Sequence, residues 1–229
     1  WRNAWLIVTL IAFLAGNFWV YVLASALFLW FIGKREKNKF ALFFILLFAV
    51  PNFSAKIPGF GLTNFLFYID YVRLLSLVVL LPAFLSLRKK SDTQAFGRNW
   101  PDRLLLVYLI LDVVLLMRGT SFADAMRGGL YNFTDAFLPY YVGSRGLKNF
   151  QQLKEVIVAF VIAGLLTSVI AIFEYSRHWL LFSSLKDALN VNWGMMNYLG
   201  RGGDLRAIVS LGQPIALGYV MVITLGFCL

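Results

Sequence analysis

Val156-Ile-Val-Ala-Phe-Val-Ile-Ala-Gly-Leu-Leu-Thr-Ser-Val-Ile-Ala-Ile-Phe-Glu-Tyr175 is the stretch that decides the fold class of this 229-residue chain. Glu174 is its only charged residue, and no proline interrupts it. A helix needs roughly 20 predominantly apolar residues, with a range of about 17–25, to cross a lipid bilayer. Basic residues stand just before the stretch, at Arg145, Lys148 and Lys154. The pattern therefore predicts a membrane-spanning helix over Val156–Tyr175.

The composition extends this prediction to the whole chain. Hydrophobic residues make up 60% of the sequence and charged residues 14%, with a mean hydropathy of +0.75. Ordinary globular domains are about 45–50% apolar and about 25% charged. A soluble core of this size cannot hide so many apolar side chains, because a large share of a small chain stays at its surface. We expect an all-α, polytopic transmembrane helical bundle.

Further apolar runs give seven or eight predicted membrane segments in one transmembrane domain over residues 1–229. Ala4–Ile32 is interrupted at Gly16-Asn17, which favours two short helices over 4–15 and 17–32, with one tilted helix as the alternative. The other predicted segments are Phe40–Val50, Phe65–Leu87, Leu104–Met117, Leu130–Val142, Val156–Tyr175 and Ala207–Leu229. Because the chain opens on Trp1 and closes inside an apolar run, we expect the natural polypeptide to continue at both ends.

The basic residues between these segments predict an orientation. The short connections that start at Gly33, Arg88 and Gly143 are densely basic, whereas the alternate ones at Pro51 and Arg118 carry few charges. In the longer connection 176–206, acidic residues offset the basic ones. Cytoplasmic loops of membrane proteins carry the excess of Lys and Arg. We therefore expect a multi-pass protein of the bacterial inner membrane with 176–206 as an outer loop.

The same placement of charge limits the possible partners. The formal net charge of +10 does not indicate a nucleic-acid partner, because the basic residues lie in short runs between apolar segments. Anionic membrane lipids or phosphate-bearing substrates fit that distribution better. Cys228 and His178 are the only residues of their types, which excludes a disulfide framework and a multi-histidine metal site within this chain. The sequence contains no Walker-type phosphate loop, so ATP hydrolysis is not expected, and we predict no cofactor and no metal.

Ionisable residues inside membrane segments are costly and mark candidate functional positions. Asp70 and Arg73 are three residues apart, on one helical face, and either form a structural ion pair or serve a polar pathway. Asp112 has no basic neighbour in its segment and is either a proton relay or a helix-contact residue. Glu174 stands near the outer end of its helix, where it could simply reach the interface.

The segment that precedes the last apolar run carries the strongest candidate for ligand binding. Gly200, Gly202 and Gly203 allow sharp bends, and Arg201 and Arg206 flank them at the predicted outer face. Arginine offers a planar fork of donors that suits pyrophosphate oxygens. Gly212-Gln213-Pro214 then predicts a kinked or broken helix near the membrane surface. These features describe either a cradle for a lipid-linked phosphate or an interfacial arginine that only orients the helix.

The stretch Leu205-Arg-Ala-Ile-Val-Ser-Leu-Gly-Gln-Pro-Ile-Ala-Leu-Gly218 resembles the Arg…Gly-x-Pro…Gly motif of the O-antigen ligase and O-antigen polymerase superfamily. The layout before it, a basic turn, a clean helix and an outer loop, is also similar to that family. The resemblance implies about a dozen transmembrane helices in a fold akin to the GT-C glycosyltransferases. It also implies transfer of a glycan from undecaprenyl pyrophosphate to an acceptor glycan or lipid at the periplasmic face.

The resemblance assigns only part of such a site to this chain. It implies that Arg206 contacts the donor's pyrophosphate, with Arg201 as a possible helper, while Gly212, Pro214 and Gly218 shape the helix. The catalytic histidine of the family lies in a periplasmic loop further along, and His178 does not match it. The chain thus corresponds to the amino-terminal portion of such an enzyme, without its catalytic base.

Two other classes of function stay open at this stage. A multi-spanning transporter or flippase would use buried Asp70, Arg73 and Asp112 in an ion-coupled or polar pathway, and broken helices occur at transporter sites. A non-catalytic membrane scaffold would not need Arg206. The residues by themselves do not distinguish ligase from polymerase.

Overall fold

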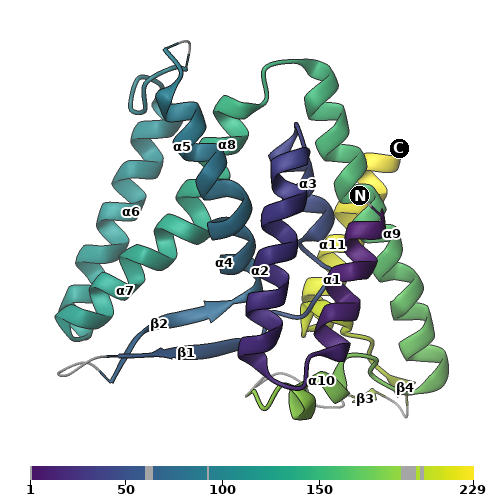
Figure 1. Cartoon of the computed structure of the whole chain (residues 1–229). Coiled ribbons are helices and arrows are strands. Elements are labelled where there is room, and N and C mark those ends of the chain that lie inside the picture. Colours follow the sequence, from purple (N-terminus) through teal and green to yellow (C-terminus); the bar gives the residue numbers. More distant parts are fainter. Residues whose placement is uncertain (1, 60–63, 92, 192–199, 202–203) are drawn as a thin grey trace.

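The computed structural model describes residues 2–59, 64–91, 93–191, 200–201 and 204–229, and this part of the chain is mostly helical. Its helices and strands, labelled in Figure 1, are α1 Arg2–Leu14, α2 Phe18–Arg35, α3 Lys39–Leu46, β1 Ser54–Pro58, β2 Phe65–Asp70, α4 Tyr71–Leu75, α5 Leu81–Lys89, α6 Trp100–Gly119, α7 Phe122–Asn132, α8 Leu138–Gly146, α9 Phe150–Arg177, α10 Ser183–Ala188, β3 Gly200–Arg201, β4 Asp204–Leu205 and α11 Pro214–Cys228.

Within the described residues, three helical stretches are long and apolar enough to cross a membrane. These are Phe18–Arg35, Tyr71–Lys89 and Phe150–Arg177, and α1 and α11 are shorter apolar helices. The predicted span Val156–Tyr175 lies inside α9, whose 28 residues extend about 42 Å at 1.5 Å per residue. Large apolar side chains are exposed along the outer faces of α2, α6, α9 and α11. Contiguous exposed apolar surface of this kind indicates contact with lipid or with another protein.

The first apolar run forms two helices, as the Gly16-Asn17 interruption predicts. α1 ends at Leu14 and α2 begins at Phe18. The side-chain oxygen of Asn17 accepts a hydrogen bond from the backbone N–H of Trp19 at 2.8 Å, which caps the start of α2. The single tilted helix over Ala4–Ile32 is therefore wrong.

The predicted span Phe65–Leu87 is wrong in its first six residues. Phe65–Asp70 forms strand β2, paired antiparallel with β1 so that Ser54 stands opposite Asp70. Arg127 on α7 donates to the backbone oxygens of Leu66 and Phe65 at 2.9 and 2.7 Å, and so ties the start of β2 to α7. The helix begins only at Tyr71 because the Asp70 carboxylate accepts the N–H of Arg73 at 2.9 Å and acts as its N-cap.

Two prolines shape the long helices that precede and follow α6 in the sequence. One continuous helix runs over Tyr71–Lys89 and contains a π-helical turn at Ser76–Leu80. The other runs over Phe122–Gly146 and contains a π-helical turn at Phe133–Phe137. Pro82 and Pro139 follow these turns. A proline within a helix lacks an N–H and clashes with the carbonyl four residues earlier. The wider π turn accommodates that clash without ending the helix. The predicted segment Leu130–Val142 is thus the central part of a longer helix.

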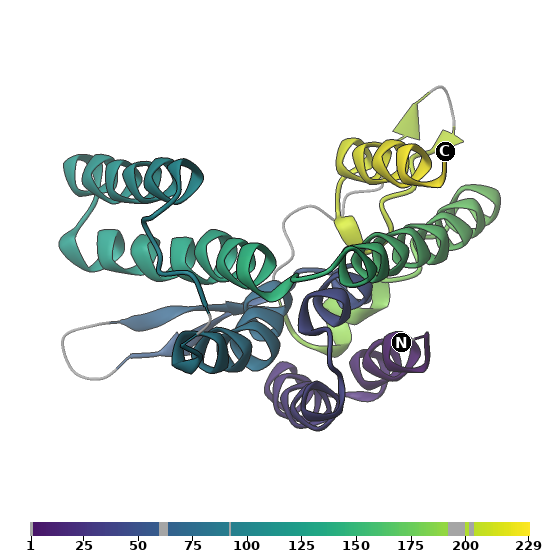
Figure 2. The same cartoon turned by 90° about the horizontal axis from the view of Figure 1, so that it is seen from above.

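The remaining differences from the predicted segments lie at helix ends. The helix predicted over Phe40–Val50 ends at Leu46, and the final helix begins at Pro214 rather than at Ala207. Seen from above, α3 stands between α9 and the group formed by α4 and α5, while α6 lies at the outer edge beside α7 (Figure 2). α9 packs against both α3 and α11.

The connections sort to two ends of the molecule in the alternation that the sequence predicts (Figure 1). The turns after α2, α5 and α8 lie at one end, which we call the basic end. The β1–β2 hairpin, the α6–α7 turn, α10 and β3–β4 lie at the opposite end. Arg206 directly follows β4 in the chain. We call this second end the arginine end.

Candidate functional site

The segment between β4 and α11 is a non-helical connection at the arginine end. Residues 206–208 are irregular, Val209–Leu211 form one 3-10 turn, and α11 starts with Pro214 at its first position. Val209 and Gly212 have φ values of 50° and 74°. Glycine adopts such a positive φ without strain, whereas a β-branched valine does so only at an energetic cost. The predicted interruption at Gly212-Gln213-Pro214 is present, but one 3-10 turn and not a helix precedes it, so α11 simply begins at Pro214.

Glu174 holds this segment in place from the end of α9. Its carboxylate is fully buried, with 0% relative exposure. One oxygen accepts the backbone N–H groups of Ile208 and Val209 at 3.0 and 2.9 Å, and the other accepts that of Leu181 at 3.1 Å. The interpretation of Glu174 as a residue that reaches the interface is therefore wrong. A buried carboxylate costs free energy unless it is hydrogen-bonded, and these three donors offset that cost.

A second anchor fixes the same segment to α3. The hydroxyl of buried Ser210 donates to the backbone oxygen of Phe48 at 2.6 Å, across 162 residues of sequence. Leu205 and Ile208 pack with Leu180 in a small buried cluster. The backbone on both sides of Arg206 is thus tied to α9, to the α3 end and to the loop after α9.

Arg206 projects from this fixed backbone. Its side chain is exposed and makes no hydrogen bond or ion pair with any residue that the structure describes. The side chain of Arg201, together with Gly202 and Gly203, lies outside the described residues, although the backbone of Arg201 pairs with that of Asp204. An exposed guanidinium on a rigid segment is free to bind an anion.

The other residues of the 205–218 motif divide by role. Gly212 takes the positive φ, and Pro214 begins α11, where its missing N–H would be unpaired in any case. An added Cβ on Gly218 would meet nothing within 4 Å in the described structure. The local geometry therefore explains a glycine at 212 and a proline at 214, but not the glycine at 218.

The predicted Asp70–Arg73 pair forms and is joined by a third residue. Arg73 Nη1 lies 2.8 Å from Asp70 Oδ2, and Nη2 lies 2.9 Å from Asp135 Oδ2. The guanidinium also lies 3.9 Å from the ring centroid of Tyr131. The sequence suggested that Asp70 lies on a helix face with Arg73, but in the structure Asp70 is the N-cap residue of α4. The cluster joins β2, α4 and the π turn that follows α7.

Asp112 links two helices through a hydrogen bond with an amide side chain. Its Oδ2 accepts a hydrogen bond from Asn132 Nδ2 at 2.7 Å, and this bond links α6 to α7. The residue borders a pocket of about 340 Å³ between α6, α7 and β2. Of the two predicted roles, the contact supports the helix-contact role.

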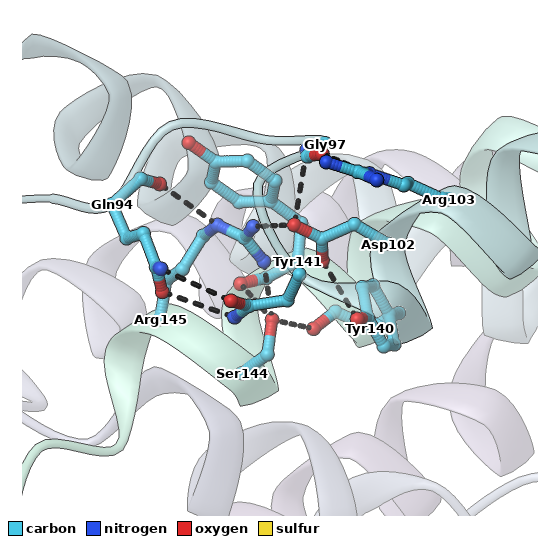
Figure 3. Close-up of polar contacts among 9 residues, drawn as sticks. Gln94, Gly97, Asp102, Arg103, Tyr140, Tyr141, Ser144 and Arg145 are labelled. Atoms are coloured by element: carbon cyan, nitrogen blue, oxygen red, sulfur yellow. Dashed lines mark hydrogen bonds and ion pairs between the residues drawn. The ribbon is translucent and has the colours of Figure 1, made fainter.

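A fourth polar cluster, which the sequence analysis missed, lies at the basic end (Figure 3). Asp102 on α6 is 1% exposed and pairs with Arg145 on α8 at 2.5 Å. Its carboxylate also accepts the hydroxyl of Tyr140 at 2.7 Å and the N–H of Gly97 at 3.0 Å. Arg145 donates further to the backbone oxygen of Gln94 at 3.1 Å. The partners are 43 residues apart, so no local pattern indicates the pair.

Fold and polar clusters together define a mostly helical chain that has three helices able to cross a membrane and an exposed arginine on an anchored segment before α11. Comparison of the chain with protein-family models, with curated proteins and with solved structures found no match in any of the three.

Proposed function

We propose that this chain forms part of an inner-membrane glycosyltransferase of the O-antigen ligase and polymerase type, in which Arg206 binds the diphosphate of an undecaprenyl-linked glycan. In this proposal the arginine end faces the periplasm, and the helices form part of a larger GT-C-like bundle. The glycan passes to an acceptor sugar or lipid. The single observation that carries the proposal is the exposed Arg206 side chain on a backbone that Glu174 fixes.

Arg206 suits this role in charge and in position. A guanidinium presents parallel N–H donors to two phosphate oxygens and stays protonated at every physiological pH. During glycan transfer, negative charge develops on the departing diphosphate, and a preorganised cation stabilises that charge in the transition state. Because the backbone N–H groups of Ile208 and Val209 are held by Glu174, the segment need not reorganise when charge develops.

The distribution of charge supports the proposed orientation. The sequence segments 33–39, 88–103 and 143–155 include the connections described at the basic end, and they contain twelve Lys and Arg against four Asp and Glu. The segments 51–73, 112–135 and 174–206 include the connections described at the opposite end, and they contain eight against seven. The positive-inside tendency then assigns the basic end to the cytoplasm. Arg206 would stand at the outer leaflet, where a lipid-linked glycan is presented to a periplasmic acceptor.

The transporter alternative receives less support from the same structure. Asp70 and Asp135 both pair with Arg73, and Asp112 is hydrogen-bonded to Asn132. An ion-coupled pathway needs side chains that exchange a protein partner for the transported ion. In the described structure, each of these four side chains is bound to a protein partner. No observation favours transport specifically, so we propose the glycosyltransferase alone.

Arg206→Ala and Arg206→Lys test the proposal through binding of undecaprenyl diphosphate to the purified protein in nanodiscs. We expect Arg206→Ala to weaken binding by about tenfold to a hundredfold, which corresponds to the loss of charge-assisted hydrogen bonds. Arg206→Lys should also weaken binding, because a single ammonium cannot reproduce the two-pronged contact. Glycan transfer by the full-length protein should fall in parallel.

Arg177→Ala is the matched control for these variants. Arg177 is an exposed arginine at the same end of the molecule, at the last position of α9, and its removal changes the net charge by the same amount. We expect this variant to bind undecaprenyl diphosphate as the unmodified protein does. Equal losses from Arg177→Ala and Arg206→Ala would reduce the effect to general surface charge and contradict the proposal.

A further inference from the structure

A pocket at the basic end is lined by four lysines that come from three separate connections of the chain. The cavity has a volume of about 360 Å³, and Lys37, Lys39, Lys90 and Lys148 border it; we call it the lysine pocket. Its size falls in the range of about 300–1,000 Å³ that is typical of small-ligand sites. The four lysines lie as far as 111 residues apart in sequence, so the fold and not a local charge run brings them together.

The pocket lies where α2, α5 and α8 end and where α3 and α9 begin. The α2–α3 turn contributes Lys37, α3 begins with Lys39, α5 is followed by Lys90, and Lys148 precedes the start of α9. Figure 1 shows these elements side by side at the basic end. Apolar side chains, including Phe40 on α3, also line the cavity. An added Cβ on Gly143 would lie 2.7 Å from the Phe40 ring, so the glycine is what lets α8 close this side of the cavity.

The positive charge of the lysine pocket is only partly compensated by the protein. Lys37 and Lys90 are exposed and make no ion pair with a carboxylate among the described residues. Lys39 donates to the backbone oxygens of Gly33 and Glu36, and the negative charge of Glu36 offsets part of its own charge. Ammonium groups gathered around one cavity repel each other, and an anion placed between them relieves that repulsion.

Polar groups of the wall make hydrogen bonds around the cavity. Glu36 is the one acidic residue in the lining, and one of its carboxylate oxygens accepts the backbone N–H groups of Lys37 and Asn38, at 2.9 and 3.2 Å. The Asn38 amide donates to the backbone oxygen of Gln152 and to Glu155. Helix α9 begins beside the pocket, and its cap residue Asn149 makes no side-chain capping bond. The positive end of the α9 dipole adds to the lysine charge.

We propose that the lysine pocket binds a phosphate group. Two sources present this chemistry at the end of a membrane helix bundle: the headgroup of an anionic phospholipid and a free phosphate ion. Basic pockets between membrane helices on the cytoplasmic side bind anionic headgroups in other systems. The site is separate from Arg206, which directly follows β4, and β4 lies at the opposite end of the molecule (Figure 1). The proposal does not depend on glycan transfer.

Isothermal titration calorimetry on the purified protein in an uncharged detergent tests the proposal at fixed ionic strength. The probes are inorganic phosphate and two soluble short-chain lipids, dihexanoyl phosphatidylglycerol and dihexanoyl phosphatidylcholine. The test variant is Lys37→Gln/Lys90→Gln. The matched control is Lys89→Gln/Lys154→Gln, which removes two exposed lysines of the same end that do not line the pocket. All four positions are exposed, so thermal melting should show that both variants fold.

We expect the test variant to bind inorganic phosphate or the anionic phosphatidylglycerol about tenfold or more weakly than the unmodified protein does, because two charge-assisted contacts are lost. The control should stay within about twofold of the unmodified protein. Tighter binding of the phosphatidylglycerol than of inorganic phosphate identifies a lipid headgroup, and equal binding identifies a free anion. The proposal is overturned if none of the probes binds, or if both double variants weaken binding equally.

Discussion

Asp102 and Arg145 form the most completely buried ion pair among the described residues, and their environment explains why the pair persists. Burial alone raises the pKa of the Asp102 carboxyl, but hydrogen bonds from Arg145, Tyr140 and Gly97 and the charge of Arg145 outweigh that effect. The pKa of Asp102 therefore lies below its usual value. Arg145 is flanked by the rings of Tyr141 and Phe96, which shield its guanidinium from water. The pair ties the start of α6 to α8, the last part of the continuous helix whose first part, α7, packs against α6.

Asp102→Asn should destabilise the protein because it leaves the Arg145 guanidinium buried without a counter-charge. Removal of one partner of a buried ion pair costs about 3–5 kcal/mol. We expect the free energy of unfolding in detergent micelles to fall by roughly 3 kcal/mol at neutral pH. Asp124→Asn, which removes an exposed carboxylate paired with Arg127, is the comparison and should have much less effect. Similar losses for the two variants would mean that the buried pair contributes no more than a surface one.

The same pair predicts how stability depends on pH. A carboxyl whose pKa is lowered in the folded state contributes stability above its unfolded pKa of about 3.9, and loses that contribution as the pH falls through the folded value. The difference in unfolding free energy between the unmodified protein and Asp102→Asn should therefore be constant at neutral and mildly acidic pH. It should shrink only below about pH 4. A difference that shrinks already near pH 6 would show that the folded pKa is not lowered.

Sequence reasoning located individual charged residues better than it located their partners. Asp70 and Arg73 could be paired because they are three residues apart. Glu174 stood out as the one charge in a clean span, yet its three donors come from a loop that is irregular and distant in sequence. Arg145 was interpreted as part of a basic turn, although Asp102 neutralises it. Long-range partners of this kind depend on tertiary packing, which single-sequence patterns do not contain.

At the scale of elements, the close crossing of α9 and α11 depends on Gly164, which has no side chain. A Cβ built on Gly164 would lie 2.1 Å from Thr224 Oγ1 and 3.0 Å from Thr224 Cβ. Small residues allow membrane helices to approach closely and to pack by van der Waals contact. The crossing positions α11 relative to α9, and the segment that carries Arg206 connects the two through Glu174.

Gly164→Ala should push α11 away from α9 and destabilise the bundle. Overpacking of this kind costs about 1–3 kcal/mol. Gly226→Ala, on α11, is the control, because an added Cβ there meets nothing within 4 Å of the described structure. That variant should be neutral or gain up to about 1 kcal/mol from helix propensity. Unfolding in micelles measures both, and the double variant Gly164→Ala/Thr224→Ala should recover part of the loss. Equal stability of Gly164→Ala and Gly226→Ala would argue against a close crossing.

The sequence predicted helices correctly where apolar runs are long. It failed where contacts between residues distant in sequence decide the conformation. Val156–Tyr175 and the break at Gly16-Asn17 are local features, and both appear in the structure. Phe65–Asp70 is rich in aromatic residues and reads equally well as helix or strand in an apolar setting. Its strand conformation depends on pairing with β1 and on Arg127, which is more than 60 residues away. The break before α11 was predictable from Pro214, but the anchoring by Glu174 and Ser210 was not.

At the scale of the whole molecule, the two ends differ in charge and in the chemistry that they offer. The basic end carries the lysine pocket and the Asp102–Arg145 pair. The opposite end carries Arg206, the β1–β2 hairpin and the Asp70–Arg73–Asp135 cluster. The proposed glycan transfer depends on this polarity, because a lipid-linked glycan meets the protein from the periplasmic side. The orientation in the membrane is therefore the claim on which the account rests.

Cysteine labelling in intact bacterial cells measures that orientation most directly. Cys228→Ser provides a cysteine-free background, into which Asp187→Cys at the arginine end or Asn149→Cys at the basic end is introduced. Both positions are exposed. A membrane-impermeant maleimide should label Asp187→Cys in intact cells and Asn149→Cys only after the cells are broken. Labelling of Asn149→Cys from outside, with Asp187→Cys protected, would contradict the account.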